Sequence, residues 1–316
     1  MDFKYQKIDR GWVALIILII LLSSSCKRRG VITTVKKPSA PISFKSIAGI
    51  NFTEVRRRLS SGLSFDNYGF EAEPGYKITF LKNDSASVYS PDKKAFINFL
   101  VFLEQDSIFN VARSYFKMKH MSKDSLILQV LEVQGDTLHL KRSLVYMTFY
   151  SNSYIKNVLH TNAETFGKPD RKDTLFIKKK SATSNRIPDS AFAARVPVQL
   201  KSKSPQLTVK RIDVQPDVLN NFDASDAYMN PEFNITIHKA YEDFSYSFLV
   251  FVDDKGQLYF DKSLLDIMPE YKESTIRTLK GIIDGYLKYY LVVTPGTTLG
   301  IPHTSAITLN VVGKKG

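Results

Sequence analysis

The segment that most constrains this chain is its first 26 residues, which end at the only cysteine of the sequence. Basic residues at positions 4, 7 and 10 precede an unbroken apolar run over 12–22, and three serines then lead to Cys26. This order is typical of a secretory signal. The eleven apolar residues would span only about 16 Å as a helix, roughly half of a bilayer's hydrocarbon core. A transmembrane helix is therefore the poorer interpretation, and the exported chain must fold without an internal disulfide.

The small residues before Cys26 resemble the lipobox of bacterial lipoproteins, although Ser23 stands where that pattern prefers leucine. The resemblance implies that the Cys26 thiol carries diacylglycerol and that Cys26 becomes the first residue after cleavage. The alternative is an uncleaved anchor with an incidental cysteine. Lys27, Arg28 and Arg29 directly follow the signal, and beside a true membrane span they would argue for a cytoplasmic C-terminal side.

The mature chain is strongly basic. Removal of residues 1–25 takes away three basic and two acidic side chains, which lowers the formal charge from +13 to +12. The basic clusters are scattered and are not interleaved with aromatic residues, so we expect no nucleic-acid partner. We interpret Lys27, Arg28 and Arg29 as contacts with an anionic membrane surface.

No residue pattern predicts catalysis, a metal site or a cofactor. The five histidines share no metal-ligand spacing, and no thiol remains once Cys26 is acylated. His303 and Ser305 lie in a polar loop around Gly296, but no orienting acid stands at an identifiable spacing. Asp253 and Asp254 are expected at a hairpin tip, where solvent would weaken acid–base work. We therefore expect a protein that is not an enzyme and has no cofactor.

The chain divides into a signal (1–25), a tether (26–46), an antiparallel β domain (47–161), a polar linker (162–206) and an α+β domain (207–316). In the β domain the patterns predict a helix at 51–59 and then a meander that closes into a barrel or packs its own side chains. The apolar stretch 96–109 fits a buried strand or a helix. A strand at 174–178 could complete this domain. The meander strands are expected at 76–81, 85–89, 115–121, 126–133 and 138–150, with turns at 122–125 and 134–136.

The clearest alternation lies in the C-terminal region. It predicts strands at 244–252 and 257–261, joined by turn residues, and a last strand at 305–312. Between them, apolar residues spaced three and four apart predict a helix over about 269–290 that packs its apolar face on a sheet. The fold class is therefore mainly β with an α+β portion: an antiparallel meander or barrel followed by a smaller β-β-α-β module.

The order hairpin, helix, proline–glycine turn and alternating strand resembles the C-terminal domain of TonB, the bacterial energy transducer. The matching stretches are 248–260, 270–290, 294–296 and 306–312. In that family an exposed strand edge pairs with a segment of an outer-membrane transporter. The resemblance implies a partner-binding edge at Ser305, Ile307, Leu309 and Val311. This chain lacks the family's long proline-rich spacer, so a borrowed binding or scaffold domain is the better expectation than energy transduction.

Together these features favour a non-enzymatic lipoprotein, held in the bilayer through Cys26 on the periplasmic face of the outer membrane, that binds an envelope protein. Lys27, in place of aspartate after the lipidated cysteine, resembles the usual signal for release to that membrane. The alternative is a lipocalin-like carrier or sensor, which requires a continuous cavity for an apolar ligand between about residues 62 and 150. A third hypothesis, an envelope hydrolase, requires His303 or His238 to meet a serine and a carboxylate.

Overall fold

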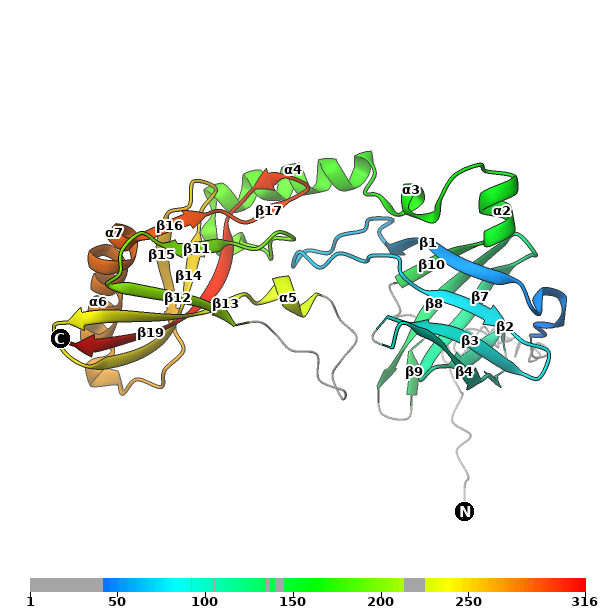
Figure 1. Ribbon diagram of the computed structural model, residues 1–316, viewed down its shortest axis with the longest axis horizontal. Coiled ribbons are helices and arrows are strands. Elements are labelled where there is room, and N and C mark those ends of the chain that lie inside the picture. The colour runs from blue at the N-terminus through cyan, green and yellow to red at the C-terminus, as the bar shows by residue number, and fades with distance from the viewer. Residues whose placement is uncertain (1–41, 92, 105, 135–136, 140–144, 213–224) are drawn as a thin grey trace, which may run out of the picture. The chain divides into compact units, whose positions relative to one another are not determined.

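An antiparallel sheet of short strands makes up the N-terminal portion of the chain that the computed structural model describes (Figure 1). The structure describes residues 42–316 except 92, 105, 135–136, 140–144 and 213–224. Cys26, Lys27, Arg28 and Arg29 lie outside the described residues, as does most of the turn predicted at 134–136. Of the helices described, none has the length and apolar character that a membrane crossing requires.

The strands of this sheet come after a 3-10 turn η1 (Lys45–Ile47), and most are joined by short connections, except that residues 60–76 lie between β1 and β2. Their order across the sheet is β4-β3-β2-β1-β10-β8-β7-β6-β5, and β9 is added beside β8. The predicted meander is thus present, including the hairpin turn at 122–125 between β7 and β8. The strands are β1 (Asn51–Leu59), β2 (Lys77–Phe80), β3 (Ser85–Ser90), β4 (Ala95–Leu100), β5 (Phe102–Leu103), β6 (Ile108–Val111), β7 (Ser114–Met121), β8 (Ser125–Gln134), β9 (Thr137–His139) and β10 (Val145–Ser151).

The sheet curls until its two outermost strands meet. β4 and β5 stand at opposite ends of the strand order, yet only Val101 separates them in sequence. A single residue spans less than 4 Å, so the two edges lie side by side where the chain crosses from one to the other. The backbone N–H of Val101 donates to the carbonyl of Asp84 beside β3, at 2.9 Å. The meander is therefore a nearly closed barrel, which confirms the predicted fold class.

Aromatic side chains fill the barrel interior. Phe44 stacks on Phe80 with ring centroids 4.0 Å apart, and Phe109 meets both rings edge-on, at 5.0 and 5.9 Å. Phe116 stacks on Phe109 at 5.5 Å. These rings are buried, together with aliphatic residues of β2, β3, β8 and β10. Such packing stabilises the barrel by removing large apolar surfaces from water.

The prediction of a helix at 51–59 is wrong, because this segment is β1 at the middle of the sheet. β1 carries a bulge against β10 between Glu54 and Arg56, and an extra residue in a strand changes which side chains face inward. Phe52 and Glu54 are buried by ordinary alternation, and at the bulge Val55 is buried as well. The bulge thus gives apolar residues the three-residue spacing that a helix would show.

The apolar stretch 96–109 forms strands, not a helix, and much of it is exposed. Its side chains are buried at Val101, Ile108 and Phe109 but open to solvent at Phe96 and Leu100. The reason is position: β4 and β5 are the outermost strands of the barrel sheet, so each is paired on one side only.

The segment predicted as a polar linker is largely helical. It contains α3 (Ala163–Gly167), α4 (Arg171–Arg186), the 3-10 turn η2 (Pro188–Ser190) and the short strand β11 (Gln199–Ser202). A further short helix, α2 (Asn152–Asn157), precedes it directly after β10. The predicted strand at 174–178 is wrong, because these residues lie in α4. Asp170 and Asp173 form a capping box at the start of α4, which fixes this helix despite its polar sequence.

The C-terminal module is a mixed five-stranded sheet with a helix packed on it (Figure 1). The predicted strands and helix are all present, and the sheet order is β12-β13-β19-β14-β15. Phe248, Val250 and Leu309 meet Leu279 and Leu287 of the helix in one buried cluster. The elements are β12 (Leu207–Ile212), α5 (Asp226–Met229), β13 (Glu232–Ala240), β14 (Phe244–Val252), β15 (Leu258–Ser263), η3 (Pro269–Tyr271), α6 (Lys272–Ile282), a π-helical segment η4 (Ile283–Leu287), α7 (Lys288–Tyr290), β16 (Leu291–Thr294), β17 (Thr297–Thr298), β18 (Ile301–Pro302) and β19 (Ser305–Lys315).

The predicted partner-binding edge is a central strand. β19 pairs with β14 antiparallel and with β13 parallel, so both of its backbone edges are already hydrogen-bonded. Ser305, Ile307, Leu309 and Val311 are at most 2% exposed. The prediction failed because it overlooked β13, whose alternating Phe233, Ile235 and Ile237 occupy the position that would otherwise have been open.

Candidate functional site

The edge strands of the C-terminal sheet are β12 and β15, each of which pairs with one described strand. On β15 the rings of Tyr259 and Phe260 lie under the ammonium groups of Lys288 and Lys280, at 5.6 and 6.0 Å. Lysines beside an edge strand discourage indiscriminate pairing with other sheets, because a partner must displace or accommodate their charge. The two lysines therefore protect the β15 edge from non-specific pairing with other sheets.

Four exposed apolar side chains follow β15 within eight residues. Leu264, Leu265, Met268 and Tyr271 are between 39% and 64% exposed. We call residues 264–271 the apolar loop. Single exposed apolar residues are common on protein surfaces, but a concentrated group is a feature of interaction sites.

The apolar loop is held in place by its backbone. The N–H of Leu264 donates to the carbonyl of Ser247 on β14 at 2.9 Å, and that of Leu265 donates to Ser263 Oγ at 3.1 Å. The N–H of Tyr271 donates to the Met268 carbonyl at 3.0 Å, where η3 begins. These bonds present the four apolar side chains from a fixed backbone, so little ordering would accompany binding.

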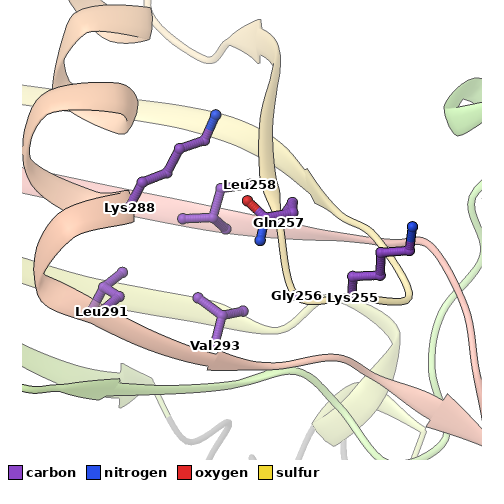
Figure 2. A pocket seen from close by; sticks show the side chains of 7 residues that line it. All are labelled: Lys255, Gly256, Gln257, Leu258, Lys288, Leu291 and Val293. Carbon is purple, nitrogen blue, oxygen red and sulfur yellow. The ribbon is translucent and has the colours of Figure 1, made fainter.

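A shallow hollow lies between the β14–β15 turn and the end of the helix, and Figure 2 shows its lining side chains. Gly256 has φ +79°, and a Cβ there would stand 2.6 Å from the carbonyl oxygen of Val293, so the close approach of the two walls requires glycine. Lys288 is paired with Asp284 at 2.8 Å. The hollow is lined by Lys255, Gly256, Gln257, Leu258, Lys288, Leu291 and Val293, which offer two ammonium groups but no carboxylate or imidazole for acid–base chemistry.

The turn beside this hollow uses Asp253 as a structural residue. Its Oδ1 accepts hydrogen bonds from the N–H groups of Lys255 and Gln257, at 2.9 and 2.8 Å. This is the turn chemistry that the sequence predicts for the hairpin tip.

His303 is buried and satisfied by neutral partners. Its Nε2 is 2.9 Å from Thr298 Oγ1 and its Nδ1 is 3.2 Å from the carbonyl oxygen of Thr304. The His303 ring stacks on the Phe192 ring with centroids 3.7 Å apart, and the Lys180 ammonium lies over the Phe192 ring. Neither nitrogen has a carboxylate partner, so the arrangement required by the hydrolase hypothesis is not formed at His303. His238 lies elsewhere, with its Nε2 3.0 Å from Thr208 Oγ1.

Burial lowers the pKa of His303 to about 4, and the nearby Lys180 adds to the effect. In the unfolded chain the His303 imidazole takes up a proton near pH 6.5, whereas in the folded chain it stays neutral down to about pH 4. The depressed pKa therefore lowers stability as pH falls from 6.5 to 4, by roughly 3 kcal/mol in all. We expect His303→Gln to flatten this part of the pH profile in urea unfolding. The exposed His120→Gln serves as control, and equal slopes for both variants would contradict the assignment.

A buried ionic cluster joins α4 to the segment after β1, and sequence reasoning missed it. Asp173 Oδ1 accepts from the backbone N–H of Ser64 at 2.7 Å, and its Oδ2 accepts from the N–H of Asp170 at 2.9 Å. Arg58 Nη2 lies 3.4 Å from Asp173 Oδ2, and its Nη1 donates to Ser64 Oγ. The sequence places Arg58 in a run of three arginines, but its side chain is buried here.

Neighbouring Glu54 and Arg57 form a second pair within β1. Both Glu54 oxygens accept from Arg57, at 2.8 and 2.7 Å, and Oε2 also accepts from the N–H groups of Gly75 and Tyr76. Together with desolvation by burial, the Glu54 carboxylate raises the pKa of the Tyr76 hydroxyl to about 12. Arg58 thus links β1 to the start of α4, and Arg57 makes its ion pair within β1, so this run is a structural feature.

Comparisons with known proteins give no identification: no protein-family model matches the chain, and no curated protein matches it. Over the residues that the structure describes, no three histidine, cysteine or acidic side chains gather as a metal ion would need.

Proposed function

We propose that this chain is a non-enzymatic, lipid-anchored envelope protein that recognises another envelope protein through the apolar loop and the adjacent β15 edge. One observation carries the proposal: four apolar side chains stand exposed on an ordered loop directly after an edge strand. An extended segment of the partner would align with β15, and its apolar side chains would cover Leu264, Met268 and Tyr271. This mode is β-strand addition, in which backbone hydrogen bonds supply affinity and side-chain contacts supply specificity.

The anchor is Cys26, with Lys27, Arg28 and Arg29 beside anionic headgroups, and the site of action is the periplasmic face of the outer membrane. Support comes from the signal-like order of residues 1–26. The resemblance to the TonB C-terminal domain supports the binding mode, with the edge now placed at β15 instead of β19. The filled barrel interior gives less support to the apolar-ligand alternative.

The anchor is tested by the mass of the protein made in its own cell. We expect a mature chain that begins at Cys26 and carries acyl groups, and we expect Cys26→Ser to abolish the acylation. Trp12 is the only tryptophan, so cleavage also removes indole fluorescence. A full-length chain that retains Trp12 and carries no lipid would contradict the anchor.

Partner binding is tested by a photocrosslinking residue placed at position 268 in the anchored protein, with position 175 as the matched site. Leu175 is 57% exposed on α4 and Met268 is 64% exposed. We expect one protein to be crosslinked from position 268 alone. The double variant Leu264→Ser/Met268→Ser should weaken its capture by about tenfold or more, since each side chain contributes roughly 1–2 kcal/mol when buried.

The matched control is Val158→Ser/Leu175→Ser, which removes two equally exposed apolar side chains elsewhere. The control should capture the partner as the unaltered protein does. Equal loss in both double variants, or equal crosslinking from positions 175 and 268, would contradict recognition by the apolar loop.

A further inference from the structure

A second group of exposed apolar side chains lies on the barrel, where β4 passes into β5. Phe96, Leu100, Phe102 and Leu103 are between 37% and 64% exposed. We call these four residues the seam. They stand on the two outermost strands of the sheet, which meet at Val101. Single exposed apolar residues are normal on a protein surface, but four large ones within eight residues form a patch. Such a patch indicates a surface that contacts a partner or a membrane.

The described chain enters the barrel at the end where the seam crosses. Phe44, close to the start of the described residues, stacks on Phe80 at 4.0 Å and meets Phe109 at 5.0 Å. Phe109 pairs across the sheet with Leu103, a seam residue. The N–H of Gly49, just after η1, donates to the Phe80 carbonyl at 2.8 Å. The described chain thus enters the barrel against β6, the strand that pairs with the seam strand β5.

The strand pairings place the β4-to-β5 crossover at the same end of the barrel as Phe44 and Phe80. Phe80 pairs with Ala86 and Ser85 pairs with Leu100, while the N–H of Val101 donates to the Asp84 carbonyl. Only 15 residues separate Cys26 from Ile42, so even a fully extended connection spans at most about 55 Å. An acylated Cys26 therefore keeps this end of the barrel within tens of ångströms of the bilayer.

We infer that the seam is a membrane-contacting surface, in which Leu100, Phe102 and Leu103 insert among lipid headgroups while Cys26 holds the chain to the same bilayer. The inference rests on the proposed lipid anchor and adds to it a second, non-covalent contact. The diacylglycerol on Cys26 would already place two acyl chains in the bilayer, which is enough for stable attachment. The seam adds a contact from the folded barrel, and this contact orients the barrel on the membrane.

Charge around the crossover gives no attraction to anionic lipid. Lys45 and Lys82 are exposed at this end of the barrel, and so are Asp84, Glu104 and Asp106. Two basic and three acidic side chains do not draw this end toward anionic headgroups, so apolar insertion must supply the contact. An apolar contact is insensitive to screening, whereas attraction between surface charges falls with ionic strength. We therefore expect the seam's contact with lipid to persist at 1 M salt.

The test uses a single tryptophan as a depth reporter in the full chain. All variants carry Trp12→Phe, so Phe102→Trp and the control Leu175→Trp each contain one tryptophan; Leu175 is as exposed as Phe102, at 57% against 58%. Each protein is incorporated into phosphatidylethanolamine–phosphatidylglycerol vesicles with brominated acyl chains, both as the acylated protein and with Cys26→Ser. Bromine quenches indole only at short range, and side chains that enter the headgroup boundary reach about 5–10 Å into it.

We expect bromolipid to reduce emission from the reporter at position 102 about twofold in the acylated protein, and the control at position 175 to stay unquenched. Equal quenching at both positions, or none at 102 in a protein whose mass shows acylation, would overturn the inference. A blue shift at 102 without quenching would show that a second protein surface covers the seam, which also overturns it.

The Cys26→Ser arm separates the two proposals. If the mass shows no acylation of the unaltered chain, the lipid anchor fails by that measurement alone. Quenching at position 102 in the Cys26→Ser protein would then still establish the seam as a lipid contact. Acylation without quenching at 102 leaves the anchor intact and rejects the seam.

Discussion

Replacing Asp173 by alanine is expected to lower the free energy of unfolding by about 3–5 kcal/mol. It removes the nearer of the two carboxylates beside the buried Arg58 guanidinium and leaves only Asp170, whose Oδ2 is 3.6 Å from Arg58 Nη2. The substitution also removes the acceptor for the N–H groups of Ser64 and Asp170, which donate to Asp173 at 2.7 and 2.9 Å. Each buried donor left without a partner costs a further desolvation penalty. Asp173 itself is 0% exposed, so water cannot replace the lost carboxylate without a local rearrangement.

Urea unfolding at pH 7 measures this loss, and Asp189→Ala is the matched control. Asp189 is an exposed residue of η2, and its removal should change stability by less than about 0.5 kcal/mol. The double variant Arg58→Leu/Asp173→Ala removes both charges and should be less damaging than the sum of the two single variants. Additive losses would mean that Arg58 and Asp173 do not stabilise each other.

Phe109→Ala is expected to destabilise the chain by about 3–5 kcal/mol, through lost burial and the cavity that remains. Phe109 is fully buried and contacts Phe44, Phe80 and Phe116, so several rings lose a packing partner at once. Phe102→Ala removes the same side chain from a site that is 58% exposed, and its cost should stay below about 1 kcal/mol.

This comparison also bears on function. A barrel that carries an apolar ligand tolerates changes to side chains that line an open cavity, whereas a packed barrel does not. Thermal or urea unfolding of the two variants, with emission of bound apolar dye as a second reading, distinguishes the cases. A small effect of Phe109→Ala would favour the carrier alternative over a barrel that only packs its own side chains.

Local patterns were sufficient for most strands and for the C-terminal helix. Alternation at 244–252 predicted β14 with its observed bounds, and the four-residue spacing of Leu279, Ile283 and Leu287 predicted the buried stripe of the helix. These predictions succeeded because each depends on periodicity within one element. The short polar turn at 122–125 likewise specified the β7–β8 hairpin.

The same patterns failed where two segments distant in sequence come together. Phe52 and Val55 have helical spacing, but pairing of β1 with β10 and β2 makes this segment a bulged strand. The capping signal at Asp170 and Asp173 was present in the sequence and would have indicated the start of α4. No local signal indicates that Arg58 is the ionic partner of Asp173, because 115 residues separate the two.

The sequence by itself determined the signal-like order of basic, apolar and serine residues over 1–26, the mainly β composition of the fold and the strand–strand–helix–strand succession at its end. Those properties follow from charge, length and periodicity, which are local. Only the tertiary structure decided that β19 is central, that β15 and the apolar loop are exposed, and that the seam opens beside the point where the chain enters the barrel. Strand order and exposure depend on which distant segments pair, and a strand's own alternation is the same at the centre of a sheet as at its edge.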